Sequence, residues 1–179
     1  MKRLLATMML MATLIVPSVA AAQQQSLLDQ AVRDALATFE RAAPSLSGVE
    51  FGVDMAAYGR ALRGQTFQSA VWGGQVSVKR TIRDAATGSC GRFAAFVRIP
   101  PENGVVSLVL CPQFFTEGAD ALRELTILHE MVHVVAGSSE CQAMALAARI
   151  EQAAHGRFTP VGKYWAASGC EGSPYRLPD

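Results

Sequence analysis

The stretch Leu128-His129-Glu130-Met131-Val132-His133 lies in a window, residues 120–136, that contains neither Gly nor Pro. Apolar residues recur through this window at helical spacing, which predicts a helix with a buried face. In a helix, positions i and i+4 lie on the same face, so the imidazoles of His129 and His133 can reach one metal ion. Glu130 follows one step round the helix, where its carboxylate can contact a metal-bound water without being a ligand.

The pattern H-E-x-x-H is typical of zinc-dependent peptidases. The chain contains only three histidines, so their pairing at this spacing favours a metal site over two satisfied core histidines. We expect Asp120 or Thr116 to cap the start of the helix and Gly137 to end it.

A second helix is predicted from Glu140 to Ala154, capped by Ser138 or Ser139. Two helices joined by so short a turn pack antiparallel, which places Glu140 level with His133. Because catalytic zinc takes three protein ligands, Glu140 is the predicted third ligand; its alternative role is a first-turn acid that complements the helix dipole. Two rival ligands remain open: Glu151, about three turns further along the same face, and His155, which otherwise caps the C-terminal end of that helix.

The N-terminus has the features of a secretory signal peptide covering residues 1–22. Lys2 and Arg3 precede an apolar run from Leu4 to Val16, and Ala20-Ala21-Ala22 offers a cleavage site before Gln23. This run is shorter than a membrane span. Without Lys2 and Arg3, the 16 basic side chains fall to 14 against 15 acidic ones, a net charge of −1. Neither nucleic-acid binding nor membrane binding of the mature chain is expected, and the protein should be secreted or periplasmic.

Residues 23–179 are enough for one domain with its own core. An amphipathic helix is predicted over residues 26–42 and strands over 76–82, 93–99 and 105–110, the last two joined by a hairpin loop at 100–104. Residues 49–75 give no clear assignment, although 54–63 could be a helix. Strands followed by helices indicate an α+β fold. Four cysteines, Cys90, Cys111, Cys141 and Cys170, suggest two disulfides in an exported chain, with three possible pairings.

The run from Cys90 through Phe93-Ala-Ala-Phe96, Val109-Leu-Cys111 and Phe114-Phe115 to the H-E-x-x-H stretch resembles the aspzincins, the deuterolysin and peptidyl-Lys metalloendopeptidase family. That resemblance covers about residues 72–170. It implies a zincin-like fold, with a small sheet and hairpin packed on the motif helix and a second antiparallel helix. It also implies the pairings Cys90–Cys111 and Cys141–Cys170, and a secreted zinc endopeptidase.

The chain departs from that family after His133. Where the family has G-T-x-D-x-x-Y-G, residues 137–143 read Gly-Ser-Ser-Glu-Cys-Gln-Ala, so Glu140 replaces the ligand Asp and Ala143 stands in place of the Tyr. Tyr164 is the nearest substitute for that Tyr, and its alternative role is a half-buried packing aromatic beside Trp165.

The sequence thus predicts a monomeric enzyme that acts on proteins or peptides. Zn²⁺ held by His129, His133 and Glu140 would activate a water, with Glu130 as general base and Tyr164 as the candidate oxyanion donor. The competing hypothesis is an exported zinc-binding protein without turnover. The absent family Tyr favours this alternative, whereas Glu130 favours the enzyme, because a closed structural site has no use for a general base.

Overall fold

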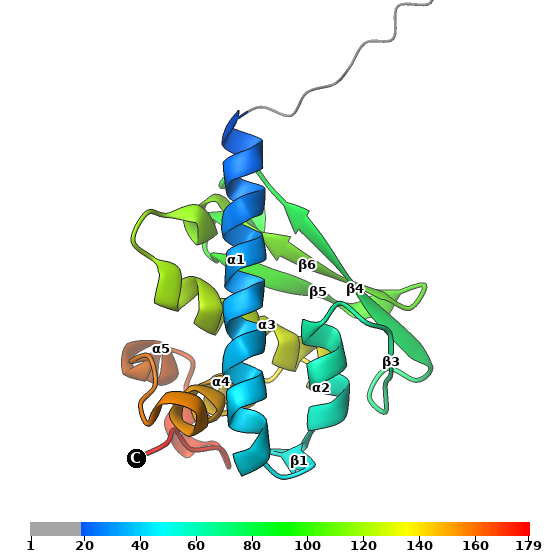
Figure 1. The fold of residues 1–179 in the computed structure, drawn as a ribbon, viewed down its shortest axis with the longest axis vertical. Coiled ribbons are helices and arrows are strands. Elements are labelled where there is room, and N and C mark those ends of the chain that lie inside the picture. The colour runs from blue at the N-terminus through cyan, green and yellow to red at the C-terminus, as the bar shows by residue number, and fades with distance from the viewer. Residues whose placement is uncertain (1–18) are drawn as a thin grey trace, which may run out of the picture.

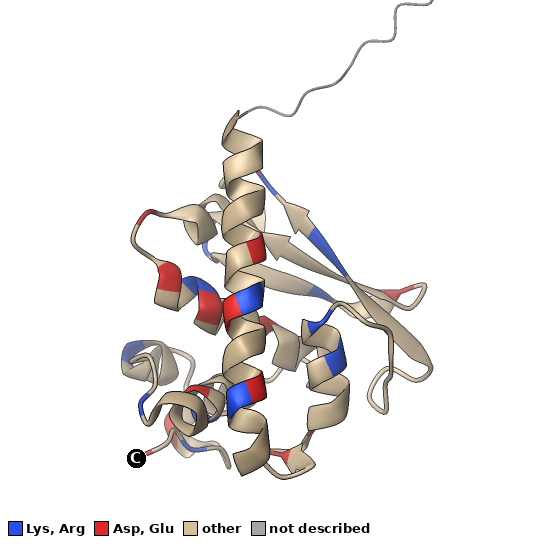
Figure 2. Ribbon diagram, in the orientation of Figure 1, with Lys and Arg blue, Asp and Glu red and all other residues tan. Residues whose placement is uncertain are grey.

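The computed structural model describes residues 19–179, so residues 1–18 of the predicted signal peptide lie outside the described residues. The first helix, α1 (Val19–Ala42), begins earlier than the predicted Ser26 and runs through the expected cleavage point before Gln23. It extends along the whole molecule in Figure 1, and it carries both acidic and basic residues in Figure 2. Within residues 19–179, none of the helices combines the length and apolar character that crossing a bilayer requires.

The main sheet has the strand order β3-β4-β6-β5 and is mixed. Its strands are β3 (Phe67–Gln68), β4 (Gln75–Ile82), β5 (Ala95–Glu102) and β6 (Val105–Leu110). β4 and β6 are parallel, with Ser77 opposite Val105 and Ile82 opposite Leu110, whereas β5 runs antiparallel to β6 at the edge of the sheet. The mixture of this sheet with helices confirms the α+β class.

The strand predictions hold for β4 and β6, but β5 lies further along the chain than residues 93–99. It continues through Pro100 and Pro101, which an edge strand tolerates because a proline nitrogen needs no ladder partner there. The turn that follows is also tighter than the predicted loop. Asn103 and Gly104 alone form it, with φ of 52° and 75°, the backbone of a two-residue type I′ hairpin turn.

The unassigned region 49–75 contains a small hairpin and a helix. β1 (Val49–Glu50) pairs with β2 (Val53–Asp54), and α2 (Met55–Leu62) follows directly. The Asp54 carboxylate accepts hydrogen bonds from the backbone N–H groups of Ala56 and Ala57, so it caps α2. The tentative helix over residues 54–63 is therefore present.

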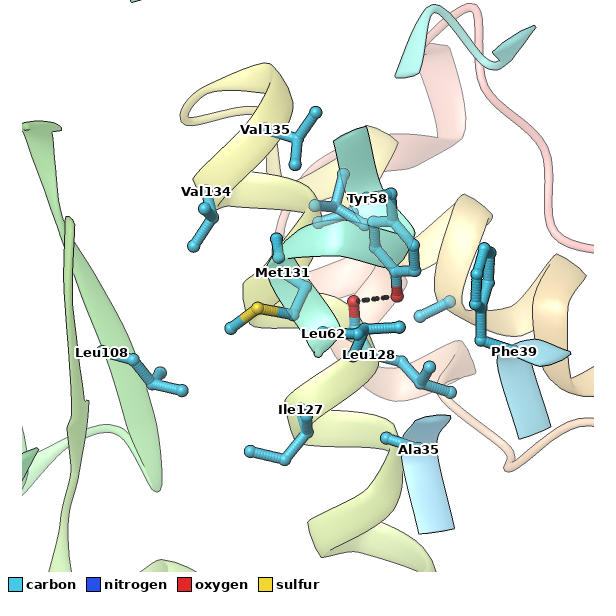
Figure 3. Packing of buried hydrophobic residues seen from close by; sticks show 14 of the residues in the cluster. Ala35, Phe39, Tyr58, Leu62, Leu108, Ile127, Leu128, Met131, Val134 and Val135 are labelled. Carbon is cyan, nitrogen blue, oxygen red and sulfur yellow. Dashed lines mark hydrogen bonds between the residues drawn. The ribbon is translucent and has the colours of Figure 1, made fainter. Parts of the chain in front are cut away.

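The motif helix α3 (Asp120–Ala136) lies at the centre of the molecule. Figure 3 shows Ile127 and Met131 facing Leu108 of the sheet, while residues of α1 and α2 pack on the other side of α3. The buried Tyr58 hydroxyl donates to the Leu128 carbonyl across 2.7 Å. Each fully buried large apolar side chain contributes roughly 1.5–3 kcal/mol to folding, so the helix is held firmly in place.

The start of α3 differs from the prediction. Ala119 occupies the cap position, and its side chain cannot cap. Asp120 is the first residue of the helix and pairs with the buried guanidinium of Arg123, which also donates to the Thr116 carbonyl. The end agrees with the prediction: Gly137 has φ of 102°, a backbone that favours Gly, and α3 stops there.

Helix α4 (Glu140–His155) begins after Ser139, whose hydroxyl accepts from the Gln142 N–H as predicted. Thr38 of α1 bonds both Glu124 near the start of α3 and His155 at the end of α4. Since the short turn joins their other ends, the two helices lie side by side and antiparallel. The short helix α5 (Gly162–Ala167) and the C-terminal tail follow.

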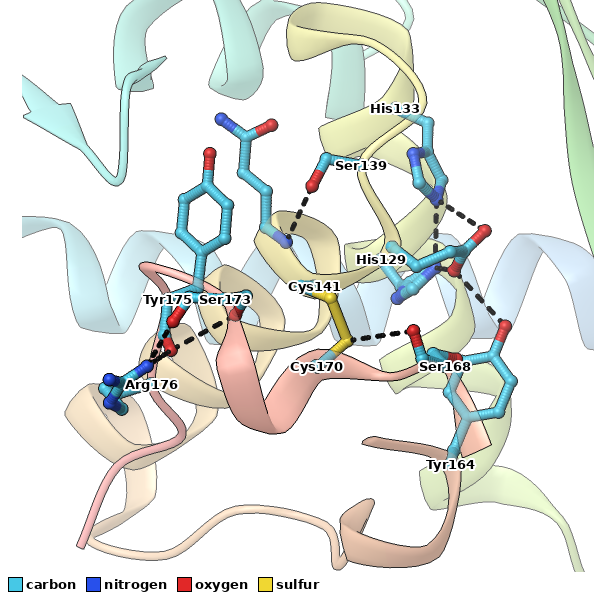
Figure 4. Close-up of a disulfide and its surroundings, with 12 residues drawn as sticks. His129, His133, Ser139, Cys141, Tyr164, Ser168, Cys170, Ser173, Tyr175 and Arg176 are labelled. Carbon is cyan, nitrogen blue, oxygen red and sulfur yellow. Dashed lines mark hydrogen bonds and ion pairs between the residues drawn. A yellow bond between two sulfur atoms is a disulfide. The ribbon is translucent and has the colours of Figure 1, made fainter. Parts of the chain in front are cut away.

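Two disulfides are present, Cys90–Cys111 and Cys141–Cys170. The first joins the segment before β5 to the end of β6. The second ties the first turn of α4 to the tail beyond α5 (Figure 4). Disulfides persist in oxidising surroundings, which indicates an extracellular or similarly oxidising environment.

Candidate metal centre

The two motif histidines project from one face of α3 into a shared space. Their Nε2 atoms are 3.1 Å apart, and their ring centroids lie 4.8 Å apart. His133 is buried and His129 is half-buried. In Figure 4 both rings point away from α3 towards the same carboxylate, as the i, i+4 spacing predicted.

That carboxylate belongs to Glu140. Its Oε2 lies 3.1 Å from His129 Nε2, and its Oε1 lies 3.6 Å from His133 Nε2. One ligand atom from each of the three residues fits within 4.8 Å of the others, so this group could hold a metal ion. The turn at residues 137–139 and the Ser139 cap aim the first residue of α4 back at α3, and the adjacent Cys141–Cys170 bond fixes that turn of helix.

The protonation of His133 follows from its second nitrogen. Nδ1 is 2.8 Å from the Gly137 carbonyl, which can only accept, so Nδ1 must carry the hydrogen. In the neutral ring, Nε2 therefore directs a lone pair at the Glu140 carboxylate and at His129. A metal ion between these atoms could bind one nitrogen of each ring and a carboxylate oxygen. Without a metal ion, the hydrogen bonds that Glu140 makes with His129 and His133 hold the pKa of its carboxyl well below its usual range.

Glu130 lies next to this cluster but is not part of it. The side chain is buried, and its Oε2 has no hydrogen-bond partner among the described residues. Burial raises the pKa of the Glu130 carboxyl, although the two histidines and a backbone interaction with Val97 oppose the rise. A buried carboxylate oxygen without a partner costs about 1–3 kcal/mol or more, which is a feature of functional sites rather than of packing.

Tyr164 of α5 completes the visible surroundings of the cluster. Its hydroxyl is 3.2 Å from Glu140 Oε2, and its ring centroid is 6.3 Å from that of His129 (Figure 4). Burial, together with Glu140, raises the pKa of Tyr164 to about 12, so the hydroxyl keeps its hydrogen at neutral pH. Ala143, at the position of the family Tyr, is fully buried in the core.

Neither rival ligand reaches the cluster. Glu151 is buried and accepts from the Thr159 N–H at 2.7 Å and from the Thr159 hydroxyl at 2.9 Å. The His155 ring lies against α1, 3.0 Å from both Thr38 and Arg41. Both residues sit at the opposite end of the α3–α4 pair, so neither can be a ligand of the His129–His133 site.

Two cavities open at the cluster, and sequence reasoning located neither. The smaller, about 210 Å³, lies over the ligands and along β5, including Val97 and Ile99. The larger, about 650 Å³, extends from His129 and Glu130 towards α5. Leu122 has the helical spacing of the apolar residues of α3, but only the structure shows that its side chain is exposed at the larger cavity.

A comparison of the chain with protein-family models, with curated proteins and with solved structures finds no match. The function is therefore inferred from the geometry of this site.

Proposed function

We propose that this protein is an exported, zinc-dependent endopeptidase with a zincin-like fold, a divergent relative of the aspzincins. One observation carries the proposal. Three metal-ligating side chains converge beside a buried carboxylate, Glu130, that neither belongs to the ligand group nor has a partner for its Oε2. A structural metal site fills its coordination sphere with protein ligands, whereas a catalytic site keeps one position open and needs a base next to it.

The donor set supports zinc as the metal. Two imidazole nitrogens and one carboxylate oxygen are a standard set for catalytic zinc, whereas calcium and magnesium prefer oxygen ligands throughout. When bound, zinc would supply an activated water and polarise the carbonyl that is attacked. The hydrogen bond from His133 Nδ1 to the Gly137 carbonyl orients that ring for binding, as such bonds do for metal-ligating histidines.

The remaining residues have roles that follow from their positions. Glu130 takes a proton from the attacking water and delivers it to the leaving nitrogen. The Tyr164 hydroxyl, which keeps its hydrogen, donates a hydrogen bond to the oxyanion that develops on the carbonyl. Proton transfer and charge stabilisation are thus assigned to residues on different elements, α3 and α5.

The strand β5 supports a peptide as the substrate. It is the edge strand of the sheet, and its residues line the smaller cavity together with the ligands. An extended peptide can add to such an edge through backbone hydrogen bonds, largely independently of its sequence. The packing of the β5–β6 hairpin sheet on the H-E-x-x-H helix also fits the zincin-like interpretation.

The proposal is tested by zinc content and by cleavage of an unfolded protein. Glu130→Gln should bind zinc like the parent and lose about 10²–10⁴-fold of its activity, as is usual for a general base. Glu140→Ala should lose zinc itself. Glu151→Gln is the matched control, a buried carboxylate change outside the site, and it should keep both zinc and activity. Equal cleavage by the parent and Glu130→Gln would refute the peptidase proposal.

The second candidate, an exported zinc-binding protein without turnover, is favoured by one observation: Ala143 replaces the Tyr of the related enzymes and is buried in the core. A parent protein that binds one zinc per chain but cleaves nothing in a broad panel of unfolded proteins would select this candidate.

A further inference from the structure

The larger cavity beside Glu130 is an apolar cleft bounded by three elements. The segment before β5 contributes Phe93, the outer face of α3 contributes Leu122 and Leu125, and the segment at the start of α5 contributes Val161. Leu122 is 55% exposed, and Phe93 and Tyr164 are also among the few large apolar side chains exposed in residues 19–179. Exposed apolar side chains that gather round one cleft mark a binding surface rather than a packing defect.

Charge at this cleft has one sign. Arg92 and Lys163 line it and are exposed, and the Arg92 guanidinium lies 5.3 Å from the Phe93 ring centroid. Among the described residues that line the cleft, Glu130 is the only carboxylate, and it is buried at the inner end. A lysine or arginine side chain entering the cleft would therefore find apolar walls and two positive charges, and no exposed carboxylate partner.

We propose that this cleft holds a large apolar side chain of a peptide substrate, and that Arg92 and Lys163 favour acidic over basic residues next to it. The proposal rests on the peptidase function above and assigns the class of its substrates. The volume of about 650 Å³ lies within the range of about 300–1,000 Å³ typical of ligand sites, so it can hold one large side chain and part of its neighbour. Because Phe93, His129 and Glu130 line both cavities, a peptide lying along β5 can place its carbonyl at the ligands and its side chain in the cleft.

Cleavage specificity tests this assignment. An unfolded protein is digested with the zinc-loaded parent, the cleaved bonds are identified by mass spectrometry, and rates are then measured on peptides that differ only at the preferred position. Phe and Leu peptides should be cleaved with a kcat/KM at least about tenfold above that of the Lys peptide, since a single methylene in such a pocket changes specificity by about 10–200-fold. Lys or Arg at that position, cleaved as fast as Phe, would overturn the proposal.

Two variants localise the preference. Leu122→Glu places a carboxylate in the wall at an exposed position, so the Phe peptide should lose rate and the Lys peptide should gain it. Arg92→Glu should shift the neighbouring preference from acidic to basic residues. Lys79→Glu is the matched control, because Lys79 is exposed on β4 and lines neither cavity. The same shift in Lys79→Glu, or none in Arg92→Glu, would refute the role of the cleft charges.

Binding separates this proposal from the peptidase function. Affinities of the same peptides for zinc-loaded Glu130→Gln are measured by calorimetry, which needs no turnover. Apolar preference in binding without cleavage by the parent would keep the cleft assignment and refute the peptidase. Efficient cleavage without apolar preference would do the reverse.

Discussion

The two ends of the α3–α4 pair contain the same kinds of residues and differ in what their polar atoms contact. Each end brings histidine and glutamate side chains from the two helices together. At the end near β5, the Nε2 atoms of His129 and His133 and the carboxylate of Glu140 lie within 3.1–3.6 Å of one another. At the far end, Glu124, Glu151 and His155 lie among donors.

At the far end, each of these polar side chains has a hydrogen-bond partner of the opposite kind. Arg41 can only donate, so His155 Nδ1 accepts from it and His155 Nε2 carries the hydrogen. That nitrogen donates to the Thr38 hydroxyl, which in turn donates to Glu124. Glu151 is matched separately by the N–H and hydroxyl of Thr159. Such a network stabilises the junction of α1, α3 and α4, and a cavity of about 410 Å³ lies beside it.

The comparison shows how a binding site is distinguished from a structural cluster of the same composition. A structural cluster satisfies its donors and acceptors internally, because each unmatched buried group costs about 1–3 kcal/mol. The cluster near β5 instead brings two imidazole nitrogens and a carboxylate to one point, and Glu130 Oε2 beside it has no partner among the described residues. A metal ion and its bound water would contact those atoms.

The largest effect expected from this difference is on zinc-linked stability. Zinc at a thousand times its Kd should stabilise the parent by about 4 kcal/mol, since it binds the folded chain. His133→Ala should abolish this gain, whereas His155→Asn, at the far end, should keep it. Thermal unfolding with and without zinc measures both. A gain that survives His133→Ala, or disappears in His155→Asn, would mean that the metal binds elsewhere.

Sequence reasoning located this site because its geometry is local. The i, i+4 spacing fixes His129 and His133 on one face, and a turn of three residues leaves the next carboxylate little choice of position. The rival His155 could not be dismissed from sequence, because its partners Thr38 and Arg41 come from α1, more than a hundred residues earlier in the chain. The rival Glu151 is bonded by Thr159, in the segment after α4, a contact that no helical spacing predicts.

Other features depended on long-range contacts in the same way. Gly59 lies inside α2, where a Cβ would come within 2.8 Å of the Phe39 ring of α1, so its place in a helix depends on a contact twenty residues away. At the start of α3, Asp120 pairs with Arg123 and no side chain caps the helix. The cleft is formed by β5, α3 and α5 together, and no spacing of residues in the sequence predicts that these three elements lie close to one another.

A somewhat smaller effect on stability is expected from removal of the Cys141–Cys170 disulfide, which lies beside the proposed metal ligands. Cys141–Cys170 closes a loop of sequence separation 29, for which chain entropy gives about 3.6 kcal/mol. Replacing both cysteines with Ala should destabilise the protein by about that amount and weaken zinc binding, because Glu140 adjoins Cys141. Replacing Cys90 and Cys111, separated by 21 residues, should cost about 3.3 kcal/mol without the loss of zinc affinity. Equal zinc affinities in the two variants would contradict the role of the second bridge.

The far end should respond in stability but not in zinc binding. Thr38→Val keeps the shape of the side chain and removes the hydroxyl between His155 and Glu124, at a cost of about 1–3 kcal/mol. The control is Thr126→Val, which removes an exposed hydroxyl bonded to the Leu122 carbonyl of its own helix and should change stability by less than about 0.5 kcal/mol. Urea unfolding measures both, and similar losses in the two variants would show that this hydrogen-bond network contributes nothing specific.

The smallest effect is a pH dependence at Glu151. Burial raises the pKa of this carboxyl above its ordinary value of 4.5, the Glu124 charge adds to the rise, and the bonds from Thr159 oppose it. The folded chain therefore binds the proton more tightly than the unfolded chain. Stability from this group is fully present below about pH 4.5 and is lost as pH rises through the folded pKa, by at most about 1.4 kcal/mol per pH unit.

The glutamine of Glu151→Gln does not ionise. The loss of stability that ionisation of Glu151 causes as pH rises should therefore be absent from this variant. Measured by urea unfolding from pH 4 to pH 7 with chelator present, which keeps metal out of the comparison, the variant should gain on the parent steadily as pH rises above 4.5. If the unfolding free energies of parent and variant changed in parallel with pH, the Thr159 hydrogen bonds would offset the cost of burial completely. The far end would then stabilise the charged Glu151 carboxylate as well as the neutral one. If Glu151→Gln instead becomes more stable than the parent only above pH 4.5, the charged Glu151 carboxylate destabilises the fold even where its oxygens are hydrogen-bonded.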